Sequence, residues 1–362
     1  MKEKWVVSAK KADFQAIGQR FGIDPVLARI MRNRGLTDLQ EMNLYLHGTR
    51  ADLNDPHLLK DADLAAQILR EKIKEKKRIR IIGDYDIDGI QSTYILYCAL
   101  RRLGADADFV IPDRILDGYG LNEHLVTRAS QDGIDTILTC DNGISAIDQI
   151  HLAKSLGMTV VVTDHHEVPF TEVDGVRREK VCEADAVVNP KQQACHYPFK
   201  KLCGAAVAFK LVQVLYEVFG LEVSEADCFI ENAGFATVGD VMDLQGENRI
   251  LVKLGLEMLN RTTNIGMKAL ILQNKLTMGA IKSHDIGFRI GPCLNASGRL
   301  DTARLSLKLL LCESETEAAV LAEEIVELNE SRKLLTMHAV EQAKEIAQQE
   351  EYVNDRVLVI FL

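Results

Sequence analysis

Three aspartates at alternate positions, Asp84, Asp86 and Asp88, lie between Gly83 and Gly89 in the segment GDYDIDG. In an extended segment, side chains at alternate positions project to one face. Carboxylates placed in this way repel one another unless a cation lies among them. The spacing therefore indicates a cation site. An acidic turn with two glycines is the alternative explanation when this segment is taken alone.

Further carboxylates and imidazoles follow later in the chain: Asp141, Asp164, His165, His166 and Asp240. Carboxylates combined with one or two imidazoles suit a pair of divalent ions, Mn²⁺ or Mg²⁺, and the lack of a thiolate in the set weighs against structural zinc. Two such ions side by side can hydrolyse phosphoesters, because they acidify a bridging water and stabilise the leaving oxygen. Asp141, which stands alone after its expected strand, is the candidate to bridge the two ions.

The elements that must position these residues begin at residue 78, where apolar runs typical of buried strands alternate with helical segments. Strands are expected over 78–82, 107–112, 135–140, 158–163 and 184–190, with helices over 90–103, 122–132 and up to about residue 156. Such alternation predicts an α/β fold with a parallel sheet and helices on both faces. Ligands of these sheets bind beyond the carboxyl ends of the strands. Asp84, Asp141 and Asp164 each follow such a strand.

The rest of the chain divides by its patterns into helical parts and one final apolar segment. We expect a helical N-terminal segment over 1–55, a catalytic α/β core over 56–230, a mainly helical part that completes the catalytic domain over 231–312, a long connecting helix over 313–352, and the first strand of a following domain over 353–362. Within the helical part, the Gly- and Arg-rich stretch 287–300 reads as a loop. Because the final strand has nothing in the sequence to bury it, the chain is expected to be a piece of a longer protein.

Composition limits the classes of function. The chain of 362 residues is 47% hydrophobic and 27% charged, which is ordinary for a globular protein with a sizeable core. It has no apolar run of the ~18 residues that a membrane helix needs, and it opens without a signal peptide. Eight cysteines without a CxxC pair favour a reducing cytoplasm. The net charge of −10 argues against coating nucleic acid by bulk electrostatics, but it leaves room for a local basic groove.

Five segments, in order, resemble the motifs of DHH-superfamily phosphoesterases: GDYDIDG (83–89), TCDNGIS (139–145), TDHHE (163–167), TVGD (237–240) and GPCLNASGR (291–299). More narrowly, they are similar to those of the RecJ-type exonucleases, which act on single-stranded DNA. The resemblance implies a metal-dependent hydrolase with two Mn²⁺ or Mg²⁺ ions, which digests single strands from 5′ to 3′, releases mononucleotides, and serves DNA repair and recombination. It also allows other DNA-repair proteins as partners.

The resemblance assigns roles by position. One ion would be held by Asp88, Asp141, His165 and Asp240, and the other by Asp86 and Asp141 with Asp84 nearby. The catalytic residues would be Asp141, His166, which would face the scissile phosphate, and Asp164. The strand's phosphates would be bound by Arg299, Arg289, Arg114 and Asn295. One departure is Cys293, which stands where the family usually has an arginine.

Two other functions remain open on the sequence alone. A small-molecule phosphoesterase of the same superfamily, acting on pyrophosphate, short oligonucleotides or cyclic dinucleotides, would share the site chemistry. A non-catalytic scaffold that binds replication proteins would be expected to have lost some of the ligands, and every expected ligand is present.

Overall fold

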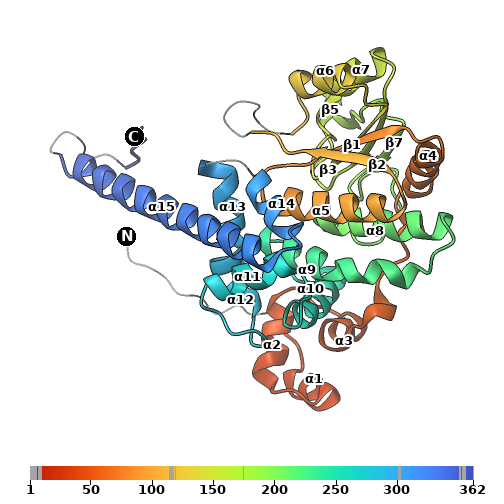
Figure 1. The fold of residues 1–362 in the computed structure, drawn as a ribbon. Helices are drawn as coiled ribbons and strands as arrows, with labels where there is room; N and C mark the ends of the chain where they lie inside the picture. The colour runs from red at the N-terminus through yellow and green to blue at the C-terminus, as the bar shows by residue number, and fades with distance from the viewer. Residues whose placement is uncertain are drawn as a thin grey trace.

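The computed structural model describes residues 6, 10–113, 118, 120–173, 175–300, 303–349, 352 and 356–361, and its centre is a parallel sheet (Figure 1). Among these residues the sheet has five strands: β1 (Arg78–Ile82), β2 (Asp106–Val110), β3 (Thr136–Cys140), β4 (Thr159–Thr163) and β7 (Ala186–Val188). Their order is β2-β1-β3-β4-β7, and each neighbouring pair is parallel. The strand order reverses between β1 and β3, and such a switch point is where open α/β sheets bind ligands.

Helices cover both faces of the sheet, which confirms the predicted fold class. The helices α4 (Ala62–Lys74), α5 (Ile87–Arg102) and α8 (Gly204–Val218) share one core with one face, and α6 (Glu123–Gln131) and α7 (Ile147–Ser155) share another core with the opposite face. Successive strand residues alternate between the two cores, as the pleat requires. In β3, Leu138 packs in the α5 and α8 core, whereas Ile137 packs in the α6 and α7 core.

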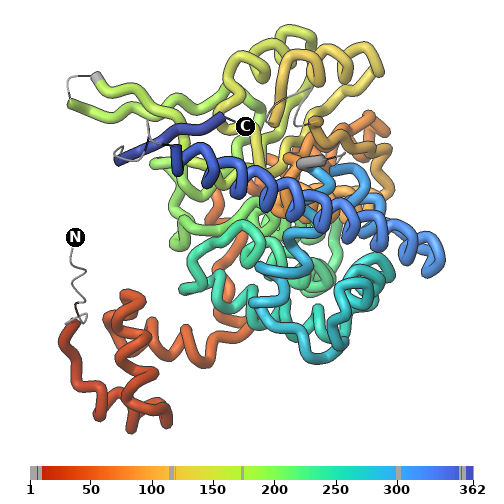
Figure 2. The backbone as a smooth tube through the Cα atoms, turned by 90° about the vertical axis from the view of Figure 1, so that its left-hand side faces the viewer, coloured from red at the N-terminus to blue at the C-terminus, as the bar shows by residue number. Residues whose placement is uncertain are grey.

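A short antiparallel hairpin, absent from our expectations, follows β4. It consists of β5 (Phe170–Val173) and β6 (Val176–Glu179), and it extends from the body of the protein in Figure 2. Most of its side chains are exposed. Because little of it faces a core, its sequence lacks the apolar run that would have predicted a strand.

The helical part after the sheet contains one clear departure from the prediction. Its elements are η3 (Val223–Phe229), α9 (Ile230–Gly239), α10 (Gly246–Leu259), α11 (Ile265–Gln273), α12 (Ser283–Asp285), the π-helix η4 (Ile286–Ile290), α13 (Gly291–Leu300) and α14 (Arg304–Leu310). The stretch 287–300, predicted as a loop, is therefore helical. Ile290, Cys293 and Leu294 are buried in a core shared with α11 and α14, and this packing outweighs the weak helix propensity of the glycines.

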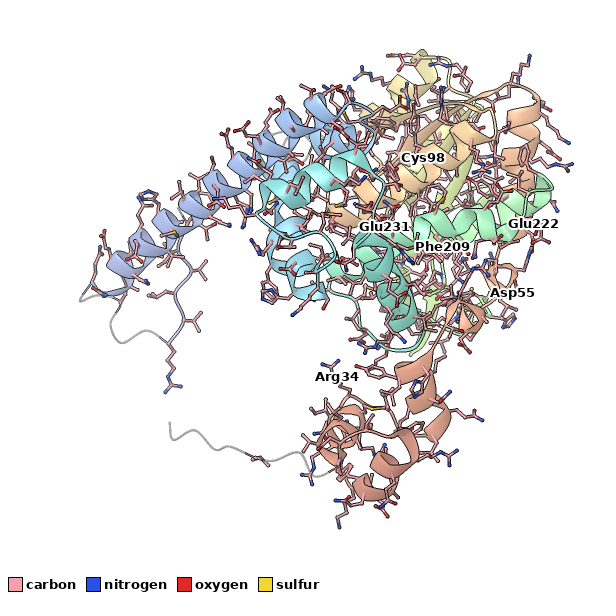
Figure 3. All side chains as sticks on the ribbon, turned by 60° about the horizontal axis from the view of Figure 1, so that its bottom comes forward. Arg34, Asp55, Cys98, Phe209, Glu222 and Glu231 are labelled. Carbon is pink, nitrogen blue, oxygen red and sulfur yellow. The ribbon has the colours of Figure 1, made fainter. Side chains whose placement is uncertain are left out.

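The N-terminal segment is helical as expected and lies against α10. It comprises α1 (Phe14–Phe21), α2 (Pro25–Asn33), α3 (Leu39–His47) and two short 3₁₀ turns, η1 (Arg50–Asp52) and η2 (Pro56–Leu58). Figure 3, where the labelled Arg34 marks these helices, shows them beside the larger body. The ammonium group of Lys253 on α10 donates to the carbonyls of Leu46 and Gly48, over 3.1 and 3.3 Å.

A long helix is present where one was expected, as α15 (Glu315–Ala347), and its first half packs on the body. Leu321, Ala322 and Ile325 are buried there, in the core of the helical part. Residues 357–361 form no strand in the structure, and Val359 is 96% exposed. The expected first strand of a following domain, over 353–362, stays a prediction. A strand needs a neighbour for its backbone hydrogen bonds, and these five residues pair with no strand in the part of the chain that the structure describes.

The described helices were also compared with the length and hydropathy that a membrane span requires. None of them is long and apolar enough to cross a membrane.

Candidate metal centre and active site

The loop between β1 and α5 carries the first three carboxylates, in a conformation that differs from the expected extended one. Asp86 caps α5, because its Oδ1 accepts from the backbone N–H groups of Asp88, over 2.9 Å, and Gly89, over 3.1 Å. Asp88 already lies in the first helical turn. A Cβ at position 89 would overlap the backbone of Asp84, so glycine is required for the loop to fold back onto the helix.

The carboxylate of Asp88 is buried against the N-terminus of α8. Its Oδ2 accepts from the N–H of Gly204 over 2.6 Å, and its Oδ1 accepts from the N–H of Ala205 over 2.8 Å. The first N–H groups of a helix have no partner within the helix and favour negative charge. The start of α8 therefore fixes this carboxylate and keeps a buried anion in place.

Asp141 lies directly after β3, at the switch point of the sheet. Its φ of 61° is in the left-handed region, which is uncommon for a residue other than glycine and is frequent at functional sites. The next side chain, Asn142, donates from Nδ2 to the carbonyls of Ile82, over 3.0 Å, and Cys140, over 2.9 Å. The ends of β1 and β3 are thereby joined beside the carboxylate of Asp141.

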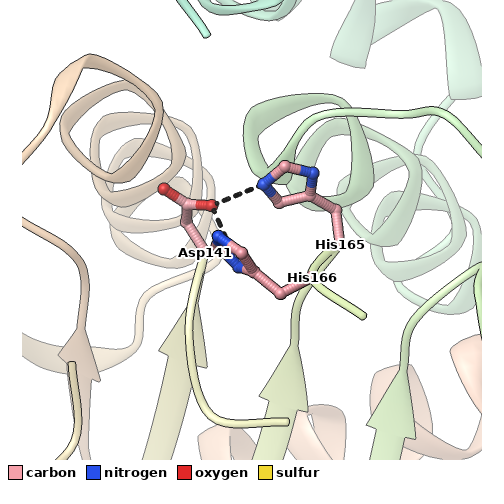
Figure 4. Close-up of side chains that lie close together, drawn as sticks. All are labelled: Asp141, His165 and His166. Carbon is pink, nitrogen blue, oxygen red and sulfur yellow. Dashed lines mark ion pairs between the residues drawn. The ribbon is translucent and has the colours of Figure 1, made fainter. Parts of the chain in front are cut away.

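The loop after β4 places His165 among three carboxylates. Its Nε2 lies 3.0 Å from Oδ1 of Asp141, 3.5 Å from Oδ2 of Asp88 and 3.7 Å from Oδ2 of Asp240. Asp240 reaches this position from the end of α9. Figure 4 shows that Asp141 also faces the second imidazole, with Nδ1 of His166 4.0 Å from the same Oδ1.

Asp164 makes contacts of a different kind. Its Oδ2 accepts from the N–H of Ile144 over 2.9 Å, and its Oδ1 lies 2.8 Å from Nδ1 of His166. Oδ1 also accepts from the N–H groups of His165, over 2.7 Å, and His166, over 3.0 Å. Both oxygens are thus engaged in holding the two histidines and the loop after β3, and Asp164 belongs to none of the ligand groups described next.

Three overlapping groups of side chains could each hold a divalent ion, with their ligand atoms within 4.8 Å of one another. They are Asp84, Asp86 and Asp141; Asp88, His165 and Asp240; and Asp141, His165 and His166. Asp141 is shared by two of these groups. The fit to a cation is also chemical: the buried Oδ1 of Asp84 has no hydrogen-bond partner among the described residues, as expected for an oxygen that gains an ion.

The electrostatics of the cluster favour binding of positive charge. Burial, followed by the nearby charge of Asp86, raises the pKa of Asp84 to about 7. Burial, followed by the charge of Asp88, raises the pKa of Asp240 to about 7 and lifts the pKa of Asp141 well above its ordinary value. These carboxyls take up protons unless a cation compensates their charge.

The pKa values of the two histidines are shifted in opposite directions. Burial lowers the pKa of His165, so its imidazole is neutral near pH 7 and can act as a ligand. Burial acts in the same direction on His166, but the hydrogen bond and the charge of Asp164 outweigh it and raise the pKa of His166. For Asp164, burial opposes ionisation, yet the hydrogen bond from His166 leaves the pKa of Asp164 below its ordinary value.

The structure places the predicted phosphate-binding residues only in part. Asn295 lies beside the loop between β1 and α5: its Oδ1 accepts from the N–H of Ile87, the first residue of α5, over 2.8 Å. Arg289 does not join the cluster through any contact. It donates to the carbonyl of Asn274 over 2.6 Å and lies 3.7 Å from Asp285.

The side chains of the other two predicted arginines are not among those that the structure describes. Arg114 lies outside the described residues. The backbone of Arg299 continues α13 next to Gly298, where a Cβ would overlap the carbonyl of Tyr85, but the side chain of Arg299 is not among those described.

Cys293 is buried, with its Sγ 3.1 Å from the carbonyl of Arg289 and 3.4 Å from Nδ2 of Asn329 on α15. It therefore contacts α15, and no contact joins it to the carboxylates.

Two residues that support the site were not predicted. Gly204 faces Asp141, and a Cβ there would lie 2.7 Å from the Cβ of Asp141. Asn189, just after β7, donates from Nδ2 to the carbonyl of His166 over 3.0 Å. The position of Asn189 at the end of an expected strand was a usable signal, whereas nothing local distinguished Gly204.

Comparisons with known proteins agree with this geometry. The family model described as DHH family, N-terminal domain, matches residues 78–232. The chain is 36% identical to the single-stranded-DNA-specific exonuclease RecJ of Bacillus subtilis, over 99% of this chain and 44% of that protein. It is 34% identical to the exonuclease of the same name from Escherichia coli, over 86% of this chain and 54% of that protein. The chain thus spans about half the length of the curated relatives that it matches.

Solved structures show the same likeness. A crystal structure of exonuclease RecJ bound to manganese matches with a TM-score of 0.70 and 34% identity, over 78% of this chain and 69% of that one. A crystal structure of RecJ from Thermus thermophilus in complex with Mn²⁺ matches with a TM-score of 0.74 and 29% identity, over 91% of this chain and 45% of that one.

Proposed function

Because the chain belongs to the RecJ family of DHH proteins, we propose that it is the catalytic part of a metal-dependent exonuclease that hydrolyses the phosphodiester bonds of single-stranded DNA. Digestion proceeds from the 5′ end and releases mononucleotides, in DNA repair and recombination. Single-stranded DNA is the substrate, other DNA-repair proteins are its partners, and the cytoplasm is its place of action.

One observation carries this proposal: three carboxylates from three elements converge on one buried imidazole. Asp88, Asp141 and Asp240 lie within 3.0–3.7 Å of Nε2 of His165, at the switch point of the sheet. Such a ligand set suits Mn²⁺ or Mg²⁺. In phosphoester hydrolysis both the attacking oxygen and the leaving oxygen are stabilised by positive charge, which ions at this place would supply.

We assign the ligands as the resemblance implies. Asp88, Asp141, His165 and Asp240 would hold one ion, while Asp86 and Asp141, with Asp84 nearby, would hold the other. The groups Asp88, His165, Asp240 and Asp84, Asp86, Asp141 described above support these two sets. When bound, the ions supply a nucleophilic hydroxide at neutral pH and neutralise the charge that develops on the phosphoryl oxygens.

The remaining polar groups act on the substrate. Asp164 positions His166 by binding its Nδ1, which orients the ring so that Nε2 can face the phosphate. Because the pKa of His166 is raised, the ring is more often protonated and donates a hydrogen bond to a phosphoryl oxygen. Asn295 holds the start of α5, and with it the first-loop carboxylates, from the neighbouring α13. The arginine Arg299, next on that helix, is assigned to a phosphate of the strand, and so is Arg114.

The test uses the purified chain with Mn²⁺ and four substrates: a 5′-labelled single strand, a 3′-labelled single strand, the matching duplex and a dinucleotide. We expect labelled mononucleotide from the 5′ label at once, from the 3′ label only when digestion is complete, and little from the duplex. Faster hydrolysis of the dinucleotide than of the long strand would instead identify a small-molecule phosphoesterase. Binding of the strand without hydrolysis in Mn²⁺ would identify a scaffold.

A further inference from the structure

A lysine borders the carboxylate cluster and has no part in the function proposed above. Lys191 lies in the loop after β7, two residues beyond Asn189. Its N–H donates to Oδ1 of Asn189 over 2.8 Å, and Nδ2 of the same asparagine donates to the carbonyl of His166 over 3.0 Å. The side-chain amide of Asn189 thus connects the backbone of Lys191 to that of His166, in the loop after β4.

The ammonium group of Lys191 is paired with the exposed carboxylate of Glu167, which is easily displaced. Its Nζ lies 3.1 Å from Oε1 of Glu167, the residue after His166. The side chain of Glu167 is 76% exposed, whereas that of Lys191 is only 22% exposed. An ion pair with such an exposed partner contributes little, because water and salt screen it. The lysine is therefore fixed in place while its partner is weakly bound.

The charge of Lys191 acts on the cluster itself. Burial is the main cause of the raised pKa of Asp240, and the positive charge of Lys191 opposes that rise. Burial is also the main cause of the lowered pKa of His165, and the same charge adds to it. The positive charge of Lys191 is therefore felt at both ligands, although Lys191 itself is no part of the carboxylate and imidazole groups that could hold an ion.

We propose that Lys191 exchanges Glu167 for a phosphate of the bound strand, the one next to the scissile phosphodiester. This inference rests on the proposed function and names a substrate contact within it. A strand carries one negative charge at each phosphate, so a neighbouring phosphate competes well for an ammonium group that is otherwise paired with an exposed carboxylate. Glu167, left unpaired beside the strand, repels it and limits its affinity. A substrate with a single phosphodiester lacks the neighbouring phosphate and gains nothing from Lys191.

The experiment compares three variants of the chain with Mn²⁺: Lys191→Gln, Glu167→Gln and a matched control, Lys74→Gln. Lys74 is the exposed last residue of α4, just before β1, and so lies at the sheet edge opposite the cluster. The kcat and KM are measured on an oligothymidylate at several salt concentrations, and on the p-nitrophenyl ester of thymidine 5′-monophosphate, which has one phosphodiester.

We expect Lys191→Gln to raise the KM for the oligothymidylate by about fivefold at low salt, the size of a partly exposed ion pair. Loss of one phosphate contact should also reduce the slope of log KM against log salt by about 0.7. Its kcat on the strand and its hydrolysis of the p-nitrophenyl ester should stay unchanged. Glu167→Gln should act in the opposite direction and lower the KM for the strand. Lys74→Gln should match the wild type.

Two results would overturn the inference alone. One is equal KM values for Lys191→Gln and Lys74→Gln on a strand that the wild type hydrolyses. The other is an equal loss on both substrates, which would mean that Lys191 only supports the shape of the site. A wild-type chain that hydrolyses neither substrate would instead refute the proposed function, and that result is seen before any variant is compared.

Discussion

The contact between Gly204 and Asp141 predicts a large effect from a single added methyl group. In Gly204→Ala, the new Cβ would lie 2.7 Å from Cβ and 2.8 Å from Oδ1 of Asp141. Carbon atoms in contact are ordinarily about 3.5–4.0 Å apart, so one of the two residues must move by roughly 1 Å. Because Oδ1 of Asp141 is only 3.0 Å from Nε2 of His165, the movement disturbs the ligand set directly.

We expect the variant to lose turnover by about 100-fold, the cost of a misplacement of roughly 1 Å at a reacting centre. Overpacking costs about 1–3 kcal/mol of unfolding free energy, partly offset by the ~0.5–1 kcal/mol that alanine gains over glycine in a helix. The fold should therefore survive, and circular dichroism with urea unfolding checks that it does. Calorimetric titration with Mn²⁺ and initial rates on a single strand measure the site.

The matched control is Gly287→Ala, where a Cβ would meet only Cγ1 of Val238 at 4.0 Å, an ordinary contact. It should keep both the Mn²⁺ affinity and the turnover of the wild type. If Gly204→Ala also kept both within twofold, the position of Asp141 would not be set by its contact with α8, and this reasoning would be refuted.

Three further outcomes follow from the structure. Lys210 and Glu247 form a fully buried ion pair, with Nζ 2.7 Å from Oε1. Lys210→Met should lower the unfolding free energy, measured in urea, by about 3–5 kcal/mol, because it leaves the carboxylate of Glu247 buried without its cation. A loss below about 1 kcal/mol would contradict this. The folded-state pKa values of Asp84 and Asp240, about 7, exceed those of unfolded aspartate, so the folded metal-free chain binds more protons than the unfolded chain. Its stability should therefore fall as the pH rises from about 5 to about 8. Thermal unfolding at a series of pH values measures this, and a melting temperature that rises over that range would contradict it. His165→Ala should lose one Mn²⁺ per chain, whereas His166→Ala should keep its metal and lose turnover, and metal analysis with the reverse pattern would exchange the two roles.

The sheet and the meeting of the site residues could be predicted from the sequence, because both depend on local signals. Apolar runs identify the strands, and the parallel arrangement brings Asp84, Asp141 and Asp164 to one edge. The conformation of the loop between β1 and α5 could not be predicted. Asp86 and Asp88 were expected on one extended face, but Asp86 caps α5 and Asp88 lies within it, held by the start of a helix more than 100 residues away in the chain.

The other differences have the same origin in tertiary contacts. The glycines of 291–300 suggest a loop, yet Cys293 and Leu294 are buried in a core that no local pattern announces. In contrast, the apolar residues of 357–361 suggest a strand, yet none of the described residues pairs with them. The predicted domain boundaries and the roles of the individual site residues remain predictions.

The central claim is that hydrolysis depends on ions held between Asp141 and its neighbours. The most direct measurement is the initial rate of mononucleotide release from a 5′-labelled single strand as a function of Mn²⁺ concentration, for the wild type and for Asp141→Asn. We predict a wild-type rate that rises from zero in excess chelator to saturation, is restored when Mn²⁺ is added back, and is lost at every concentration in Asp141→Asn, whose circular dichroism stays native. A full rate for the wild type in excess chelator, or a near-wild-type rate for folded Asp141→Asn, would contradict the account.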